Sequence, residues 1–236
     1  PKELIEKYGA DTVRLFSMFA APPEHSLEWS DEGVDGSHRY LKRIWYNISE
    51  FAENIGENND GIQAIDSENL TAEQKAVRFK IHETIKKVSE DFAVRQVFNT
   101  AIAACMELTN TLLKFKDDSA NGKAVLNEGW SSIVKMLSPI VPHITQELWT
   151  KLGNNGLIVD ESWVEVDESA LVKDEIQMMI QVNGKLRAKI NVPANATKDE
   201  IESQAQDDAN VQRFTEGKQI RKIIVVPKRL VNIVVA

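Results

Sequence analysis

The hydrophobic pattern changes its period once, near residue 175, and this change constrains the fold more than any other feature of the sequence. Before residue 175, apolar residues recur every three or four positions, which is the spacing of helices that bury one face. After residue 175, apolar and polar residues alternate or form short β-branched runs, as they do in strands. We therefore expect an antiparallel helical bundle followed by a small α+β domain.

The helical part is expected to begin with two short helices. The first covers residues 2–8 and should end at Gly9, and the second follows Asp11 until the Pro22-Pro23 pair stops it. Four longer runs carry apolar stripes and should form the bundle, over residues 34–55, 71–88, 92–115 and 125–137.

Local signals mark where these runs begin. Ser30 is a good N-cap for the first run, and Thr71 with Gln74 fits a capping box at the start of the second. The dipeptide Asn121-Gly122 is expected to form a turn before the fourth run.

Two prolines interrupt the helical pattern after the fourth run. Pro139 and Pro142 cannot continue a helical ladder, so the chain should kink there and restart as a helix over 143–152. The bundle then spans 34–153, and the mixed sequence of 154–175 is predicted to be a linker.

Residues 176–236 are expected to form the α+β domain, in the order β-β-α-β-β. Residues 176–182 are rich in β-formers, and Asn183-Gly184 is a strong signal for a two-residue hairpin. The next strand, 185–190, alternates basic with apolar residues. The domain is completed by a helix and two strands, over residues 197–215, 220–226 and 230–235.

The net charge of -8 conceals an asymmetry along the chain. Residues 176–236 carry ten Lys or Arg against six Asp or Glu, whereas the other 175 residues carry 18 against 30. A basic tail on an acidic body is one signature of a nucleic-acid-binding protein, but charge alone also fits a small domain that happens to be basic.

The chain shows no arrangement of residues that supports catalysis. The single cysteine, Cys105, excludes an internal disulfide and a thiolate cluster for zinc, and it agrees with a reducing, cytoplasmic setting. The histidines are scattered, at positions 25, 38, 82 and 143. We expect His143 to be structural, at a helix start, and the acidic residues to lie on solvent-facing helical positions. Neither a membrane-spanning run nor a phosphate-binding loop is present.

Basic residues provide the best candidates for a functional site. In the last domain they stand in the second strand and around the second pair of strands, at Lys185, Arg187, Lys189, Lys218, Arg221, Lys222, Lys228 and Arg229. The first three occupy alternate positions and should project from one strand face, where they could contact RNA phosphates or simply be solvated. A second group, Arg39, Lys42 and Arg43, lies on a helix beside Trp45, which is predicted to belong to the core.

Two segments resemble class I aminoacyl-tRNA synthetases. Residues 8–16 (Tyr-Gly-Ala-Asp-Thr-Val-Arg-Leu-Phe) resemble the segment after the second ATP-binding signature in the enzymes that charge leucine, isoleucine, valine and methionine. Residues 138–149, from Ser-Pro-Ile-Val-Pro-His to Glu-Leu-Trp, are similar to the hallmark of their anticodon-binding helical bundle.

Further segments resemble the bacterial leucyl branch of this family. They are Leu27-Glu28-Trp29 with Gly33 and Gly36, residues 39–45, residues 181–187 and residues 226–234. The resemblance covers essentially the whole chain, in the family's order. One departure is Lys228, where the family's Pro-Gly-Arg turn would have glycine, so the geometry of this turn stays open.

The resemblance implies a division of labour within a longer protein. The chain starts at Pro1 without an initiator Met, so we expect a catalytic domain, which binds ATP and Mg²⁺, and an editing domain to lie outside it. Residues 1–33 would connect that domain to the bundle, and residues 176–236 would grip the elbow of leucine tRNA. The linker would let the last domain follow the tRNA between the synthetic and editing poses. We expect this chain to hold no cofactor, to have no membrane partner and to act as a monomer.

Three alternatives remain open from the sequence. The chain could be the same region of an isoleucyl- or valyl-type enzyme, although it lacks their zinc cysteine cluster and long coiled coil. It could also be a protein-interaction scaffold without an RNA role, or it could hold an undetected hydrolase site.

Overall fold

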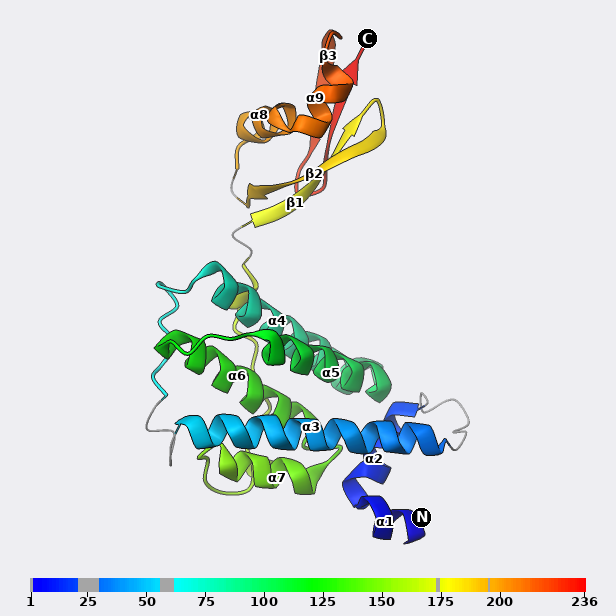
Figure 1. Ribbon diagram of the computed structural model, residues 1–236, viewed down its shortest axis with the longest axis vertical. Helices are drawn as coiled ribbons and strands as arrows, with labels where there is room; N and C mark the ends of the chain where they lie inside the picture. The colour runs from blue at the N-terminus through cyan, green and yellow to red at the C-terminus, as the bar shows by residue number, and fades with distance from the viewer. Residues whose placement is uncertain (1, 21–29, 56–61, 173–174, 195) are drawn as a thin grey trace. The chain divides into compact units, whose positions relative to one another are not determined.

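The computed structural model describes residues 2–20, 30–55, 62–172, 175–194 and 196–236. The chain divides after Leu171 into two compact units, which we call the helical unit and the sheet unit (Figure 1). The Pro22-Pro23 pair and the Leu27-Glu28-Trp29 segment lie outside the described residues.

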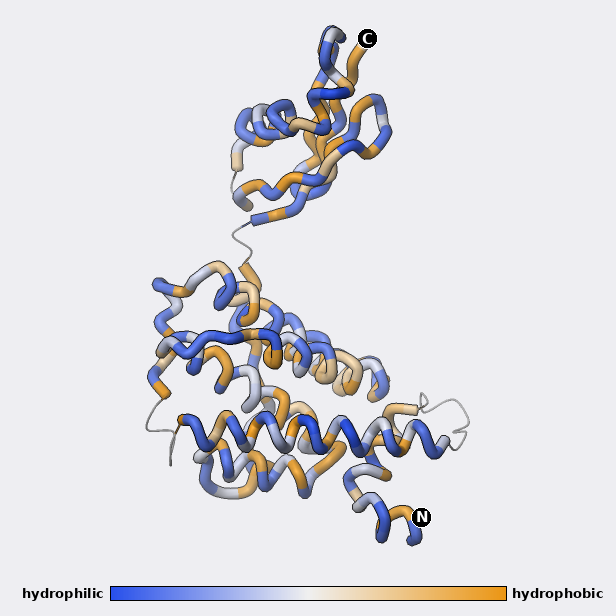
Figure 2. Tube along the Cα trace, in the orientation of Figure 1, coloured by the Kyte–Doolittle hydropathy of each residue, from blue (hydrophilic) through white to orange (hydrophobic). Residues whose placement is uncertain are grey.

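The helical unit contains the helices that the periodicity predicts. They are α1 (Lys2–Tyr8), α2 (Ala10–Ala20), α3 (Asp31–Ile55), α4 (Ala72–Glu90), α5 (Phe98–Lys114), α6 (Ala120–Leu137) and α7 (Pro142–Lys151). Figure 2 shows that hydrophobic and hydrophilic stretches alternate along these helices. Their apolar stripes meet in one core, in which Leu15, Ile44, Ile81, Leu108 and Ile133 are fully buried.

The predicted caps are confirmed. The Ser30 hydroxyl accepts a hydrogen bond from the Gly33 N–H (3.1 Å) at the start of α3. Thr71 and Gln74 form a capping box in which the Gln74 N–H donates to the Thr71 hydroxyl (3.2 Å) and the Thr71 N–H donates to the Gln74 side chain (2.9 Å). At the starts of α3 and α4, these caps therefore satisfy backbone N–H groups that have no partner within the helix.

The prediction of a turn at Asn121-Gly122 is wrong. Both residues lie in the first turn of α6, which begins five residues earlier than its apolar stripe and is capped by Ser119. Gly122 is required there because no room is left for a side chain: an added Cβ would clash with Asp117. Its backbone conformation is not the reason. A dipeptide that favours turns thus serves close packing inside a helix.

The run predicted over 92–115 begins with a different kind of helix. A single π-helical turn, η2 (Asp91–Arg95), precedes α5 and ends at Gln96, whose φ is 53°. The Asp91 carboxylate is buried and accepts hydrogen bonds from Lys87 (2.8 Å), Arg95 (3.1 Å) and Thr100 (2.6 Å). Burial opposes its ionisation, but the bonds from Lys87 and Thr100 outweigh burial and hold the Asp91 pKa below its usual value. The expectation that acidic residues face solvent is therefore wrong here.

Most of the predicted linker packs on the helical unit. Residues 154–171, which we call the strap, contain two short 3-10 turns, η3 (Ile158–Asp160) and η4 (Glu168–Leu171). Ile158 is buried, and Val164 and Val166 pack against the core. The periodicity of the strap resembles neither a helix nor a strand, which is why its packing could not be seen in the sequence.

A partly buried ionic network fixes the strap to α4 and α6. Arg78 contacts Glu128 (3.1 Å) and Asp167 of the strap (2.7 Å). His82 contacts the Glu128 carboxylate (3.1 Å) and accepts a hydrogen bond from the Asp167 N–H (3.0 Å). Hydrogen bonds from Ser169, together with Arg78, lower the pKa of Asp167 to about 2, so its carboxylate is charged at neutral pH.

The sheet unit is a four-stranded mixed sheet with two helices on one face (Figure 1). Its elements are β1 (Glu175–Val182), β2 (Lys185–Pro193), α8 (Lys198–Asp207), α9 (Ala209–Thr215), β3 (Ile220–Val226) and β4 (Leu230–Val235). The strand order is β2-β1-β4-β3; β1 and β4 are parallel, and the other two pairs are antiparallel. The predicted hairpin is confirmed, with φ of 49° at Asn183 and 76° at Gly184.

The helix predicted over 197–215 is two helices, so the order is β-β-α-α-β-β. Asp208 has an extended backbone, and its side chain accepts hydrogen bonds from the N–H groups of Asn210 (2.9 Å) and Val211 (3.1 Å). It therefore ends α8 and caps α9, because an Asp that satisfies free N–H groups favours a new helix start.

The turn between β3 and β4 contains a strained residue. The Arg229 N–H donates to the Val226 carbonyl (3.1 Å), which leaves Pro227 and Lys228 as the two central residues. Lys228 has a φ of 58°, a region that favours glycine. The sequence left this turn geometry open, and the structure places a side chain where none is favoured.

We expect Arg78→Met to lower the free energy of unfolding of the helical unit by about 3 kcal/mol, because Glu128 would lose its buried cation. Thermal or urea unfolding would measure this loss. Lys86→Met is the matched control, because Lys86 makes an exposed pair with Glu168 (3.2 Å) and such pairs contribute about 1 kcal/mol or less. Equal losses in the two variants would contradict the importance of the network.

We expect Lys228→Gly to raise the free energy of unfolding of the sheet unit by roughly 0.5–1 kcal/mol. The gain comes from relieving the left-handed backbone and is reduced by the greater flexibility of glycine in the unfolded chain. Chemical unfolding would show it, with Arg229→Gly as the control, since Arg229 has no such strain. A gain of the same size in the control would exclude this explanation.

Candidate nucleic-acid interface

The two faces of the sheet differ in what covers them. The buried residues Ile180, Val192 and Ile233 pack with Ile201 of α8 and Val211 of α9 in a second core. Within the described part of the sheet unit, no helix covers the opposite face (Figure 1), which we call the open face. The open face carries Leu186, Lys189, Asn191 and Pro193 of β2, Glu175, Gln177, Met179 and Gln181 of β1, Leu230, Asn232 and Val234 of β4, and Lys222, Ile224 and Val226 of β3.

The prediction that Lys185, Arg187 and Lys189 share one face is wrong. A β-bulge lies between the pairs Ile180–Ala188 and Gln181–Leu186, so that Arg187 has no partner on β1. Lys189 pairs with Met179 and lies on the open face, whereas Lys185 pairs with Val182, a core residue. One extra residue reverses the alternation, and a count of alternate positions along one strand does not reveal it.

The bulge directs Arg187 onto α9. Its guanidinium lies 3.8 Å from the centre of the Phe214 ring, in a cation–π contact. In the part of the chain that the structure describes, its Nε is buried and has no hydrogen-bond partner. Arg187 is thus held at the edge of the sheet by stacking and not by an ion pair.

The second pair of strands distributes its cations in a similar way. Arg221 is also a bulge residue, between the pairs Ile220–Val235 and Lys222–Val234, and Lys222 lies on the open face. The Lys218 ammonium donates to the Phe214 carbonyl (3.0 Å).

Acidic and basic residues are segregated in the sheet unit. The four strands contain one acidic residue, Glu175, whereas the segment of α8 and α9 with its caps carries six. Among the described residues, none of the eight candidate cations of this unit forms an ion pair, although Lys198 of α8 pairs with Glu202 (3.5 Å). The strands therefore present positive charge that no carboxylate among the described residues neutralises.

The cations of α3 lie beside two cavities of the helical unit. Arg39 and Arg43 line a cavity of about 820 Å³ together with Phe16 of α2. Lys42 lines another, of about 540 Å³, together with Trp45. All three cations are exposed and make no ion pair within the described residues. Trp45 packs against the core, as predicted.

His143 is structural, as expected, and its partner is Asp11. Its Nδ1 lies 2.8 Å from one Asp11 carboxylate oxygen, while the other oxygen accepts the Ile144 N–H (2.7 Å). Asp11 of α2 therefore caps α7 across 133 positions of sequence. This is a second acidic residue with a buried role that the sequence did not indicate.

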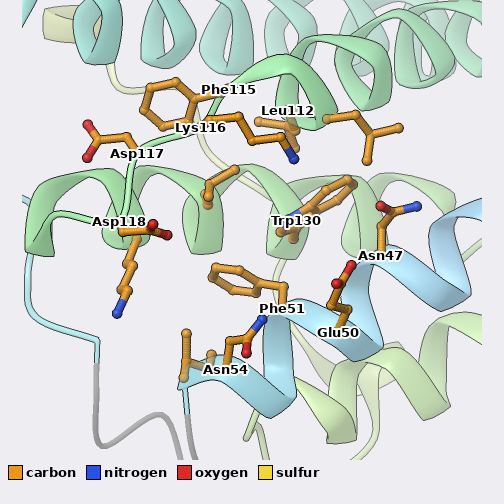
Figure 3. Close-up of a pocket in the computed structure, with 14 residues that line it drawn as sticks. Asn47, Glu50, Phe51, Asn54, Leu112, Phe115, Lys116, Asp117, Asp118 and Trp130 are labelled. Atoms are coloured by element: carbon orange, nitrogen blue, oxygen red, sulfur yellow. The ribbon is translucent and has the colours of Figure 1, made fainter.

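A third cavity, of about 210 Å³, lies at one end of the helical unit (Figure 3). Its apolar lining comes from Phe51 of α3, Leu112 of α5 and Trp130 of α6, and Figure 3 shows Phe51 between α3 and α6. The carboxylates of Glu50, Asp117 and Asp118 also line it, with Lys116 and Lys123. Asp117 is engaged by Gln74 (2.6 Å) and by the Ser119 N–H (2.9 Å). Three carboxylates make this cavity a poor place for phosphate.

The described residues meet the requirements of neither a metal site nor a membrane span. No three His, Cys, Asp or Glu side chains among them come together as metal ligands would. None of the described helices is both long and apolar enough to cross a membrane. Cys105 is buried, and burial raises the pKa of its thiol to about 12, so it is not an ionised nucleophile at neutral pH.

Comparison with known proteins identifies the family. A family model described as the anticodon-binding domain of tRNA ligase matches residues 74–202, more than half of the chain. The match runs from α4 across the strap and into α8, so it includes parts of both units.

Two curated relatives are leucine–tRNA ligases. One from Thioalkalivibrio sulfidiphilus is 54% identical over 235 residues, covering 100% of this chain and 28% of that protein. Another, from Alcanivorax borkumensis, is 54% identical over 234 residues, covering 99% of this chain and 28% of that protein. The chain thus spans about 28% of the length of these relatives.

A solved structure agrees with these matches. The crystal structure of a ternary complex of Agrobacterium radiobacter K84 LeuRS, tRNA and LeuAMS matches 100% of this chain and 29% of that chain, with a TM-score of 0.79 and 27% identity. The resemblance to leucyl-tRNA synthetases, inferred from the sequence, is confirmed. The chain belongs to the family of anticodon-binding domains of tRNA ligases, and it is similar to the leucine-specific members over its whole length.

Proposed function

We propose that this chain is the tRNA-holding portion of a leucyl-tRNA synthetase. Its helices form the antiparallel bundle of the anticodon-binding type, and its sheet unit grips the elbow of leucine tRNA. The observation that carries the proposal is the segregation of charge in the sheet unit, where the candidate cations have no carboxylate partner among the described residues. Support comes also from the matched crystal structure, which is a complex of a LeuRS with tRNA.

Phosphate contacts explain how an acidic chain can bind RNA. Binding releases counterions locally, so the charges near the contact decide the affinity and the net charge does not. The sheet unit supplies these charges from two edge strands, β2 and β3, and from the β3–β4 turn with Lys228 and Arg229. Such contacts fix the position of the RNA without reading its sequence.

The helical unit offers a second, smaller contact. Arg39, Lys42 and Arg43 project from one segment of α3 without ion-pair partners among the described residues. We place the inner side of the tRNA along this helix, with residues 1–33 joining the catalytic domain. The acidic cavity is lined by the last part of α3, from Asn47 to Ile55, so the proposed contact is limited to the part of α3 that carries the three cations.

In this proposal the chain contributes position and not chemistry. ATP and Mg²⁺ act in the catalytic domain of a cytoplasmic, monomeric enzyme, and editing acts in another domain. Holding the tRNA at two separate surfaces reduces the loss of rotational and translational freedom when its terminal adenosine enters a distant active site.

We expect the chain to bind leucine tRNA with a steep salt dependence. The triple variant Lys189→Gln, Lys222→Gln, Lys228→Gln should bind more weakly, and the slope of log K against log salt should fall in magnitude by about 3, roughly 1 for each lost phosphate contact. Filter binding at several salt concentrations measures both quantities.

Lys198→Gln is the matched control, since Lys198 belongs to the same unit but pairs with Glu202 on α8. It should leave affinity and slope unchanged. Absence of tRNA binding at low salt, or equal effects of the two variants, would exclude the proposal. A preference for isoleucine tRNA would point to an isoleucyl-type enzyme, and binding of an acidic protein in place of tRNA would point to a scaffold.

A further inference from the structure

The sequence contains the dipeptide Asn-Gly three times, beginning at Asn121, Asn155 and Asn183. Asn is one of the chemically labile residues of proteins, and a glycine after it lets the next backbone nitrogen approach the Asn side chain, because glycine has no Cβ in the way. The reaction requires an Asn side chain that can move and a glycine N–H that is not engaged elsewhere. The three copies differ in both respects.

Both groups are engaged in the copy at Asn183. The Asn183 side chain donates to the Val235 carbonyl (3.1 Å) and accepts a hydrogen bond from the Val235 N–H (3.0 Å). The Gly184 N–H donates to the Asn232 side chain (3.0 Å). Asn183 is exposed, but its amide carbon and the nitrogen that would attack it are both fixed.

Both groups are also engaged in the copy at Asn121, in the first turn of α6. The Asn121 side chain accepts a hydrogen bond from the Asp66 N–H (2.9 Å) and donates to the Asp66 carbonyl (3.3 Å). The Gly122 N–H donates to the Ser119 hydroxyl (3.1 Å), and the helix holds the backbone of both residues. Asn121 is therefore as firmly held as Asn183.

Neither group is engaged in the copy at Asn155, which lies in the strap just after α7. The Asn155 side chain is exposed and makes no hydrogen bond among the described residues, whereas its neighbour Asn154 donates to the Trp149 carbonyl (3.2 Å). The Gly156 N–H also has no acceptor within the described part of the chain. Of the three copies, this one combines a free amide side chain with a free backbone nitrogen.

We propose that Asn155 is a site of spontaneous deamidation in the folded chain. The Gly156 nitrogen attacks the side-chain carbonyl carbon of Asn155, and the side-chain nitrogen leaves as ammonia with the proton that the Gly156 nitrogen gives up. The product is a succinimide ring, which water opens at either carbonyl to give aspartate or isoaspartate. The net change is the hydrolysis of one amide to a carboxylate and ammonia, without transfer of electrons.

Isoaspartate would alter the point at which the strap begins. It inserts one further carbon into the backbone between Asn155 and Gly156 and adds a negative charge. Gln146 of α7 holds this stretch by donating to the Gly156 carbonyl (3.1 Å) and accepting a hydrogen bond from the Ile158 N–H (2.9 Å). Ile158 is buried in the core. A longer backbone cannot keep both contacts with Gln146 and the same position of Ile158, so the start of the strap should loosen.

Peptide mapping by mass spectrometry tests the proposal on the full chain after ageing at mildly alkaline pH. Conversion at Asn155 should be more than about tenfold faster than at Asn121 or Asn183, because those two sites must first break their hydrogen bonds. Fragmentation across the extra backbone carbon should identify isoaspartate. The same chain aged in denaturant is the reference, and there the three sites should react at similar rates.

Asn155→Gln is the matched variant, because it keeps an exposed amide but places one more methylene between the amide and the backbone. It should show no conversion at position 155. Proteolysis within the strap should become faster in the aged wild-type chain and should stay at its initial rate in the aged variant.

Two results would overturn the proposal. The first is equal conversion at the three sites in the folded chain, and the second is no conversion at Asn155 in the folded chain although it reacts in denaturant. Equal rates of proteolysis in the aged wild type and the aged variant would overturn the loosening of the strap. None of these outcomes depends on the binding of tRNA.

Discussion

The parallel pairing of β1 with β4 is the interaction on which the sheet unit depends. It joins two hairpins that are separated by both helices, and only four residue pairs, from Met179–Leu230 to Val182–Ile233, make the junction. Because β1 and β4 occupy the centre, β2 and β3 become the edges. Both bulges, at Arg187 and Arg221, therefore fall on edge strands, where a bulge distorts one ladder and not two. The same pairing places Met179 and Val226 in one row on the open face.

The sequence predicts elements well wherever the signal is local. Apolar periodicity locates the helices, the Thr71 and Gln74 box starts α4, and Asn183-Gly184 makes the hairpin, because each depends on residues within a few positions of one another. What it misses depends on distant partners. The strap is held by Arg78 across 89 positions, and Asp11 caps α7 across 133 positions. A bulge is defined by counting residues against the opposite strand, so alternation within 185–189 could not reveal it.

The candidate site was predicted in its composition and not in its geometry. All eight candidate cations of the sheet unit lie on or beside the strands, but they divide between the open face, the edges and a turn. The exposed apolar residues of the open face were missed although a signal was present. Residues 223–226 (Ile-Ile-Val-Val) form a continuous apolar run on an edge strand, and such a run places apolar side chains on both faces of the sheet. Burial in the second core accounts for the apolar side chains on one of those faces. It does not account for the apolar side chains on the other face.

In the proposed function, the acidic remainder of the chain would help to orient RNA and would not prevent its binding. At an ionic strength of about 0.1 M, charges more than about 10 Å apart are largely screened, so a phosphate at the open face responds chiefly to the lysines beside it. A phosphate that approached the other face would meet the carboxylates of α8 and of its caps, among them Asp199, Glu202 and Asp207. The segregation of charge thus raises the free energy of the wrong orientation as well as lowering that of the right one. A sheet unit with a neutral helical face would keep the same lysines on its strands but would lose this selection. Attraction at one face alone would let the RNA bind in several poses.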